Sequence, residues 1–259
     1  MTFRMARKFK FKLFVPNRSK TMSEAQEHAQ GVLERRMNFC ERLKYVYKTP
    51  AELYTTCEHC PQFLCICCQH LSNPSYRRCH YFPVVFIDGA CSGNGTEGAL
   101  SGIGGLFGAD PEYKWSISID DEVDPVPSRT SQRAELLAAI EGVTRLREFL
   151  LSEKWKPPPK SCQAQLVVAT DSEYVCKGVT EWMPKWKVCI FSFILRHQSD
   201  ILQKTGWRTN CGTIVKNKDL FCKLDEVISS LERRQVKVGF WRIDRQVWPN
   251  CMESLRDSP

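Results

Sequence analysis

The sequence predicts an α/β domain over residues 82–259, preceded by a basic, cysteine-rich N-terminal region with little regular structure. Two apolar runs, at 83–88 and 165–170, have the length and the Val-rich composition of buried strands. Between them, apolar residues recur at helical spacing from Leu136 to Leu150. This order of strands and helix is the pattern of one α/β domain.

The remaining elements of this domain follow from short apolar runs and capping residues. Residues 101–108 and 114–119 are expected to complete an antiparallel meander with the first strand. The remaining boundaries are a helix start at Thr130 or Ser131, a second helix start near Ser172, and a last strand at 236–241.

Positive charge is concentrated at the N-terminus. The net charge is +8, and residues 1–48 account for all of it with 12 Lys/Arg against 4 Asp/Glu. Such a segment favours nucleic acid, an anionic membrane surface or an import receptor. Residues 1–20 fit an organellar transit peptide, a nucleic-acid-binding arm or a solvated tail, and residues 23–48 are expected to form a charged helix. No apolar run approaches the roughly 20 residues of a membrane helix, so we expect no membrane partner.

The chain has 14 cysteines, but its basic start lacks the apolar core of a secretory signal. We therefore expect reduced thiols and an intracellular location, in the nucleus or the mitochondrion. Cysteines cluster in residues 57–80, where Cys57-x-x-Cys60 and Cys65-x-x-Cys68 have the spacing of two Zn²⁺-binding pairs. Because the gap between the pairs is shorter than in a zinc ribbon, a cysteine-rich linker without metal is the alternative.

The expected organisation is a tail and helix at 1–56, the cysteine-rich segment at 57–80, and the α/β domain at 82–259.

Three carboxylates stand at the edges of apolar elements. Asp88 ends the run from Val84 and is followed by a loop rich in Gly, Ser and Asn, which lifts the carboxylate out of the core. Asp171 ends the second strand in the same way, and Glu135 lies near the start of the long helix. Such a set of oxygen ligands is what a divalent-metal site for phosphate chemistry requires.

Six segments occur in a fixed order along the chain: Asp88-Gly-Ala-Cys-Ser-Gly-Asn94-Gly, Thr130-Ser-Gln-Arg-Ala-Glu135-Leu-Leu-Ala-Ala, Ala169-Thr-Asp171-Ser-Glu-Tyr-Val, Trp182-Met-Pro-Lys-Trp186-Lys, Gly206-Trp207-Arg-Thr and Val215-Lys-Asn-Lys-Asp-Leu220. With these segments, residues 82–187 and 206–241 resemble ribonuclease H type 1. The resemblance implies a mixed five-stranded sheet flanked by helices, and endonucleolytic hydrolysis of the RNA strand of RNA–DNA hybrids. It also implies two Mg²⁺ (or Mn²⁺) ions, with Asp88 bridging both and Glu135 and Asp171 each helping to hold one.

The same resemblance indicates residues that contact the hybrid. Asn94 and Gln132 align with positions that reach the minor groove and the sugar hydroxyls. A basic handle for the DNA strand is expected from aromatic and cationic side chains, namely Trp182, Lys185, Trp186, Lys187, Trp207 and Arg208. A packed aromatic core beneath a solvated basic face is the alternative for this region.

Two departures from the family pattern affect the function. Residues 188–205 interrupt the handle, either as a lengthened handle or as a retained intron, which reads of the mature transcript would distinguish. After Trp241 the expected His is absent and no Asp stands clearly at the fourth metal-binding position. Glu253 is a substitute, and Asp244 or Asp257 could approach. The terminal helix is expected to be short or missing, which removes packing from one face of the sheet.

These departures leave other functions open. One alternative is a catalytically impaired protein of this fold that binds hybrid or double-stranded nucleic acid. Another is that residues 57–80 form the main functional unit, a zinc module for protein or nucleic-acid contact. The expected oligomeric state is a monomer.

Overall fold

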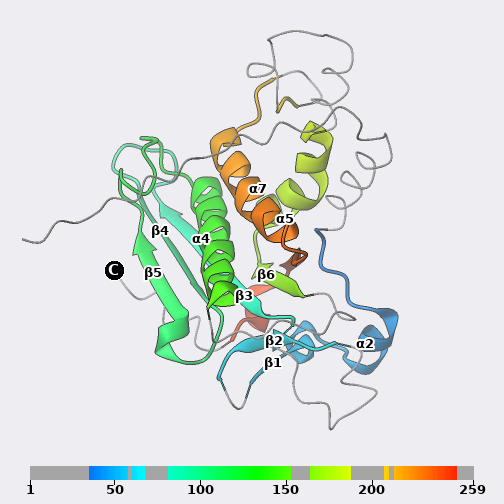
Figure 1. Ribbon diagram of the computed structural model, residues 1–259. Helices are drawn as coiled ribbons and strands as arrows, with labels where there is room; N and C mark the ends of the chain where they lie inside the picture. Colours follow the sequence, from blue (N-terminus) through cyan, green and yellow to red (C-terminus); the bar gives the residue numbers. More distant parts are fainter. Residues whose placement is uncertain are drawn as a thin grey trace, which may run out of the picture.

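A mixed five-stranded sheet forms the centre of the protein, as the sequence predicts. The computed structural model describes residues 35–57, 60–67, 81–152, 164–187, 207–209 and 213–249. The strand order is β5-β4-β3-β6-β7 (Figure 1). The strands are β3 (Val84–Ser92), β4 (Leu100–Leu106), β5 (Lys114–Ser118), β6 (Gln165–Thr170) and β7 (Lys237–Arg242). β3, β4 and β5 form the antiparallel meander, whereas β6 and β7 continue the sheet in parallel with β3.

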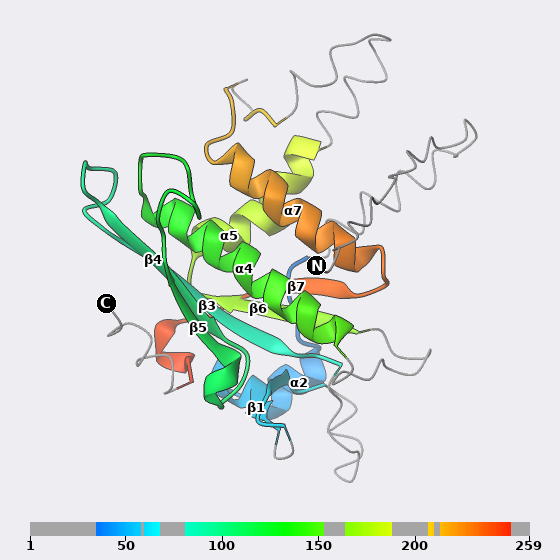
Figure 2. The same ribbon diagram turned by 60° about the vertical axis from the view of Figure 1, so that its left-hand side comes forward.

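One face of the sheet is covered by helices. They are α4 (Ser131–Leu151), α5 (Glu173–Lys177), the π-helical turn η3 (Gly178–Trp182) and α7 (Lys218–Glu232) (Figure 2). Because side chains alternate across a strand, Val85 and Ile87 of β3 join the core beneath these helices. Val84 and Phe86 join a second core on the opposite face.

The opposite face is covered by residues from the N-terminal region. This part contains α2 (Glu41–Val46), the 3₁₀ turn η1 (Pro50–Leu53) and the hairpin of β1 (Tyr54–Thr56) and β2 (Phe63–Cys65) (Figure 2). Phe39, Leu43 and Phe63 pack in one apolar cluster with Phe86 and Trp241 of the sheet. This second face of the sheet is therefore covered by residues that precede the α/β domain in the sequence.

Residues 35–37 add a short extended segment to the free edge of β7. The Phe240 N–H donates to the Arg35 carbonyl (2.7 Å), and the Met37 N–H donates to the Phe240 carbonyl (2.9 Å). The prediction of a helix over 23–48 is wrong for residues 35–40, because the backbone at 35–37 is bonded to this strand. Helix occurs only at Glu41–Val46 in the described part of that range.

Arg35 fixes this segment to α7. Its side chain is 1% exposed and forms ion pairs with Glu232 (2.7 Å) and Asp225 (2.8 Å). Burial by itself would lower the pKa of Arg35, but hydrogen bonds and charges from the two carboxylates raise it above its ordinary value. The residue is therefore held as a cation, and it joins the N-terminal segment to a helix on the other face of the sheet.

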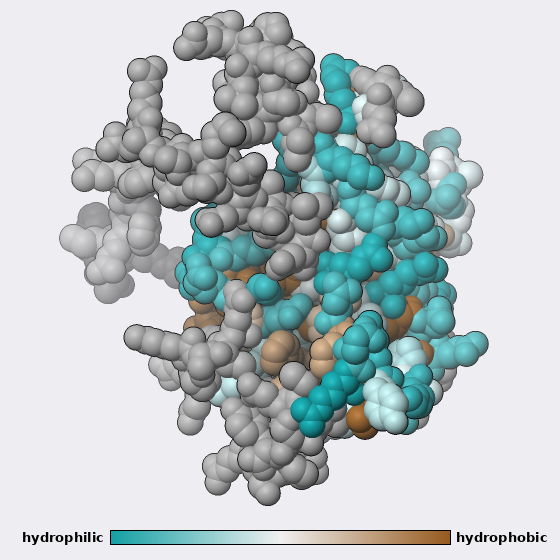
Figure 3. Space-filling view, turned by 90° about the vertical axis from the view of Figure 1, so that its right-hand side faces the viewer, coloured by the Kyte–Doolittle hydropathy of each residue, from teal (hydrophilic) through white to brown (hydrophobic). Residues whose placement is uncertain are grey.

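The molecular surface beside this segment is mainly hydrophilic. On the face viewed in Figure 3, teal residues predominate among those described, and apolar residues show between them. No helix within the described ranges is long and apolar enough to cross a membrane.

Replacement of Arg35 by Ala is expected to lower the free energy of unfolding by about 3 kcal/mol, because it breaks a buried ion pair and leaves Glu232 without the cation that binds it, whereas Asp225 keeps Lys187. Urea unfolding measures this. The neighbouring Arg36 has an exposed ion pair with Glu181 and is the matched control. Arg36→Ala should cost no more than about 1 kcal/mol. Equal losses in the two variants would show that Arg35 does not anchor the segment.

Candidate active site

The pairing of β3 with β6 brings two of the predicted carboxylates together. The strands are parallel, and Phe86 lies opposite Ala169. Asp88 and Asp171 each follow two residues later, so they fall at the same level. Asp171 comes just after β6, whereas Asp88 lies within β3, which continues to Ser92 instead of ending at Asp88 as the sequence suggested. Their side chains are 15% and 22% exposed. A single register therefore places both carboxylates beside each other within reach of solvent.

Gly89 allows the third carboxylate to approach. A Cβ at Gly89 would lie 2.3 Å from the carbonyl carbon of Ala134 and 2.5 Å from the nitrogen of Glu135. The strand thus touches the first turn of α4, which Thr130 caps by accepting a hydrogen bond from the Arg133 N–H (3.3 Å). Only glycine permits this contact, and the contact brings Glu135 next to Asp88.

Glu135 is held by a serine that the sequence reasoning did not identify. The Ser172 hydroxyl donates to Glu135 Oε2 (2.6 Å) and also accepts from the Val175 N–H (3.1 Å) as the N-cap of α5. Burial and the negative charges of Asp171 and Asp88 raise the pKa of Glu135, although the bond from Ser172 acts in the opposite direction. The three carboxylates are therefore close enough to influence one another. The only sequence signal for Ser172 was its position as a helix cap directly after Asp171.

A guanidinium also lies among these carboxylates. Arg245, in the 3₁₀ turn η4 (Arg245–Val247), donates through Nε to Asp171 Oδ2, and its Nη2 is 3.7 Å from Asp88 Oδ1. In this arrangement, the described residues contain no group of three His, Cys, Asp or Glu side chains placed to hold a metal ion. The donor set nevertheless suits a hard divalent cation, since it is made of carboxylate oxygens and already holds a positive group. Nothing in the sequence pattern pointed to Arg245.

Of the three candidates for a fourth metal-binding carboxylate, the structure describes only Asp244. Asp244 is exposed and precedes η4 as its N-cap. Glu253 and Asp257 lie outside the described residues. The assignment of a fourth ligand stays a prediction.

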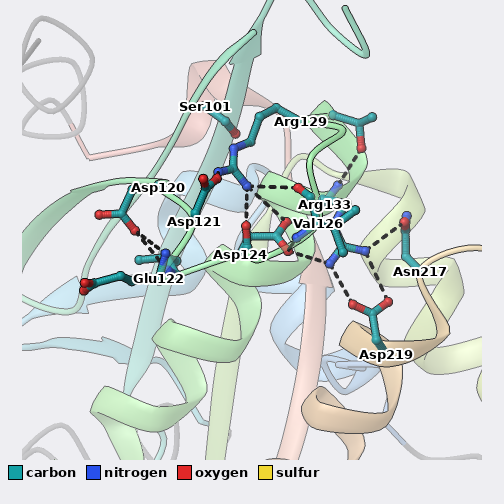
Figure 4. Close-up of polar contacts among 12 residues, drawn as sticks. Ser101, Asp120, Asp121, Glu122, Asp124, Val126, Arg129, Arg133, Asn217 and Asp219 are labelled. Carbon is teal, nitrogen blue, oxygen red and sulfur yellow. Dashed lines mark hydrogen bonds and ion pairs between the residues drawn. The ribbon is translucent and has the colours of Figure 1, made fainter. Parts of the chain in front are cut away.

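A buried ion-pair network holds the start of α4 in place (Figure 4). Arg133 binds Asp124 through two hydrogen bonds (2.7 and 2.8 Å) and Asp219 of α7 through two more (2.7 and 3.2 Å). Asp124 itself is 1% exposed. Arg129 donates to the carbonyls of Asp124 and Val126. The network ties the acidic loop before α4 and the first turn of α7 to the turn that carries Glu135.

The predicted hybrid-contacting residues Asn94 and Gln132 lie at the same end of α4. Asn94 Oδ1 accepts from the Ser131 N–H (2.9 Å), and the Gly95 N–H donates to the Arg129 carbonyl (2.7 Å). These bonds fix the loop after β3 against the helix start. Gln132 Oε1 has no hydrogen-bond partner among the residues that the structure describes. It is an acceptor next to the carboxylate site.

The predicted handle residues divide into a packed group and an exposed group. Trp182, Trp186 and Trp207 stack in sequence, with ring centroids 6.2 and 5.6 Å apart. Trp186 and Trp207 are each 9% exposed, so their rings pack against the core. Lys185 and Arg208 are exposed, and Lys187 pairs with the Asp225 carboxylate that also binds Arg35. Residues 188–205 lie outside the described part.

The predicted zinc ligands are only partly described. Cys57 is buried at the end of β1, and Cys60 follows in the hairpin loop, where burial raises the pKa of its thiol to about 11. Cys65 is buried in the apolar core of the second face, and burial raises the pKa of its thiol as well. Cys68 lies outside the described residues. Zinc binding by this segment therefore stays a prediction.

Comparison with known proteins identifies the family. Residues 83–240 match the family model described as RNase H. Ribonuclease H of Pseudomonas paraeruginosa is 34% identical over 154 residues, which cover 60% of this chain and 76% of that protein. Ribonuclease H1 of Rattus norvegicus is 33% identical over 150 residues, 58% of this chain and 40% of the rat protein. The solution structure of the PFV RNase H domain is 20% identical, with a TM-score of 0.40, and covers 68% of this chain and 89% of that domain. The chain belongs to the RNase H family.

Replacement of Gly89 by Ala is expected to lower the free energy of unfolding by about 2–3 kcal/mol, because the new methyl group would overlap the α4 backbone. Urea unfolding tests this. Gly102→Ala on β4 is the control, since its Cβ would meet nothing nearer than the Ile117 carbonyl oxygen at 3.6 Å. Similar small effects in both variants would contradict the required close approach.

Replacement of Arg133 by Gln is expected to cost about 3 kcal/mol at pH 7, because buried Asp124 would keep only Arg129, 4.0 Å away, as a cation. The hydrogen bond from Arg133 lowers the pKa of Asp219. Burial alone would raise the pKa of Asp124, but the hydrogen bonds from Arg133 outweigh it and lower this pKa as well. Stability from such carboxylates is complete above their unfolded pKa of about 4 and is lost as the pH falls through the lowered folded pKa.

The difference between wild type and Arg133→Gln should therefore shrink from pH 7 to about pH 2–3. Unfolding by urea at both pH values measures it. Arg145→Gln is the control on the same helix, because Arg145 pairs with Glu141 in a partly exposed i,i+4 pair. A loss from Arg133→Gln that does not change with pH would exclude the ion pairs as its cause.

Proposed function

We propose that the protein is an endonuclease that hydrolyses the RNA strand of RNA–DNA hybrids. The observation that carries the proposal is the convergence of Asp88, Glu135 and Asp171 in one site, in a chain of the RNase H family. Relatives named ribonuclease H, at 34% identity over most of their length, support this activity.

The three carboxylates would hold two Mg²⁺ ions, or Mn²⁺ in their place. Asp88, Glu135 and Asp171 would supply the carboxylate oxygens that hold these ions. When bound, the ions activate a water and stabilise the leaving oxygen during in-line displacement at phosphorus. Ser172 keeps Glu135 in position through its hydrogen bond, and Gly89 keeps α4 at the required distance. The protein thus supplies fixed oxygen ligands on a rigid strand pair and one helix turn.

Residues beside the carboxylates are suited to recognise the RNA strand. The Gln132 side-chain oxygen is buried and has no hydrogen-bond partner among the described residues, so its side chain would turn outward to meet a ligand. Asn94 is exposed on a loop that is bonded to the helix start. Amide side chains can exchange hydrogen bonds with a 2′-hydroxyl, which distinguishes RNA from DNA. The exposed cations Lys185 and Arg208 suit contacts to the phosphates of the other strand. We therefore propose the RNA–DNA hybrid as the partner of this surface.

A second function has one observation in its favour. Arg245 already neutralises part of the carboxylate charge, and a site filled in this way would bind metal weakly. A protein that binds hybrid or double-stranded nucleic acid with little turnover is therefore the alternative.

Cleavage of a labelled RNA–DNA hybrid in Mg²⁺ distinguishes the two functions. We expect the full chain to cleave, and Asp88→Asn to slow cleavage at least about a hundredfold, because several kcal/mol of transition-state stabilisation depend on the metal ligands. Hybrid binding, measured by fluorescence anisotropy in EDTA, should persist in the variant.

The matched control is Asp110→Asn, which changes an exposed aspartate on the turn before β5. It should leave cleavage unchanged. Hybrid binding by the wild type without any cleavage would support the non-catalytic alternative instead.

A further inference from the structure

Arg245 reaches the carboxylate site from the strand beside Asp171. β7 lies parallel to β6, with Arg242 opposite Thr170, so the turn that follows β7 begins beside Asp171. The Arg245 side chain then contacts carboxylates on two strands, Asp171 directly and Asp88 at 3.7 Å. The hydrogen bond that Arg245 donates to Asp171 and the charges of all three carboxylates raise the pKa of Arg245. The guanidinium is therefore a counter-ion for the site.

The oxygens that hold this guanidinium are those that a divalent ion needs. Asp171 Oδ2 and Asp88 Oδ1 face the Arg245 nitrogens. A Mg²⁺ ion binds carboxylate oxygens at about 2.0–2.1 Å and demands near-octahedral geometry. The guanidinium hydrogen-bonds to Asp171 and lies 3.7 Å from Asp88, so it would repel a divalent ion bound to the same carboxylates. The two cations therefore compete for the negative charge of Asp88 and Asp171.

The Arg245 side chain can leave the site while its backbone stays in place. The side chain is 57% exposed, and its guanidinium carbon lies 5.8 Å from the Trp248 ring centroid. The turn itself is held by backbone bonds from the Ile243 N–H to the Thr170 carbonyl (3.0 Å) and from the Trp248 N–H to the Arg245 carbonyl (3.1 Å). Trp248 is buried in the core of the second face. Only rotation of a solvent-exposed side chain is needed to free the carboxylates.

We propose that Arg245 is a built-in competitor of the divalent metal ion. In the metal-free protein it neutralises Asp88 and Asp171, and metal binding displaces it. Arg245 thus sets how much metal the site requires. This inference rests on the metal site of the proposed function, but it makes an independent claim about affinity. It also gives Arg245 two effects of opposite sign, since it stabilises the metal-free protein and weakens metal binding.

Arg245→Gln in the full chain tests both effects without nucleic acid. Titration with Mn²⁺, followed by the EPR signal of the free ion, should show binding about fivefold tighter than in the wild type, as expected for loss of one solvent-exposed ion pair. The melting temperature in EDTA should fall by about 2–4 °C, because the carboxylates then repel one another without a counter-ion. Arg245→Lys keeps the charge but loses the planar fork and should lie between the two.

Arg242→Gln is the matched control. Arg242 is 56% exposed and lies three residues away, but it pairs with Glu173 at 3.8 Å instead of the site carboxylates. It should leave Mn²⁺ affinity within about twofold of the wild type. An equal increase in Arg242→Gln and Arg245→Gln would overturn the proposal, because it would show only a general effect of removing positive charge.

The remaining outcomes also decide the proposal. Unchanged or weaker Mn²⁺ binding in Arg245→Gln would overturn it and leave Arg245 as a structural clamp, even if the wild type cleaves hybrid. No Mn²⁺ binding in either protein would overturn both this inference and the metal mechanism. Tighter binding in Arg245→Gln without hybrid cleavage would uphold the inference and contradict the proposed function alone.

Discussion

The parallel pairing of β3 with β6 is the constraint on which the site depends. It aligns Asp88, in the middle of β3, with Asp171, just after β6, so that the two carboxylates lie side by side. The same register turns the backbone at Gly89 toward α4, where the missing side chain lets the helix contact the strand and deliver Glu135. Three negative charges are thereby collected on two paired strands and one helix turn. Their mutual repulsion must then be offset by a cation, either a metal ion or a side chain.

Helix α7 connects the two parts of the molecule that support this site. Near its C-terminal half, Asp225 and Glu232 bind the buried Arg35 of the N-terminal segment. At its first turn, Asp219 binds Arg133, which holds the start of α4. The N-terminal segment and the start of α4 are therefore fixed to different parts of the same helix. Because buried ions are costly without partners, each pairing also specifies one position for the elements that it joins.

The N-terminal region is part of the folded domain from residue 35 onward. It pairs with the edge of β7 and supplies the apolar residues that cover the second face of the sheet. An uncovered face would expose Phe86 and Trp241, both of which are now buried. The α/β domain and the segment before it therefore share one core on this face. Such coverage of a sheet by residues distant in sequence follows from the need to bury both faces of the sheet.

The sequence by itself determined the order of strands and helices and the three carboxylates. Apolar runs that end in an acid, such as the one before Asp88, are local signals of a buried strand and a polar edge. The caps Thr130 and Ser172 are local as well, since each bonds to a backbone N–H three residues later.

Only the tertiary structure decided the positions of Arg35 and Arg245. Their partners lie 74 to 197 residues away, and no local spacing encodes them. The prediction of a helix before residue 41 is wrong for the same reason, because the backbone at 35–37 pairs with a strand edge that is distant in sequence. A charged side chain in a loop carries no periodic signal, so its role depends on what the completed fold brings beside it.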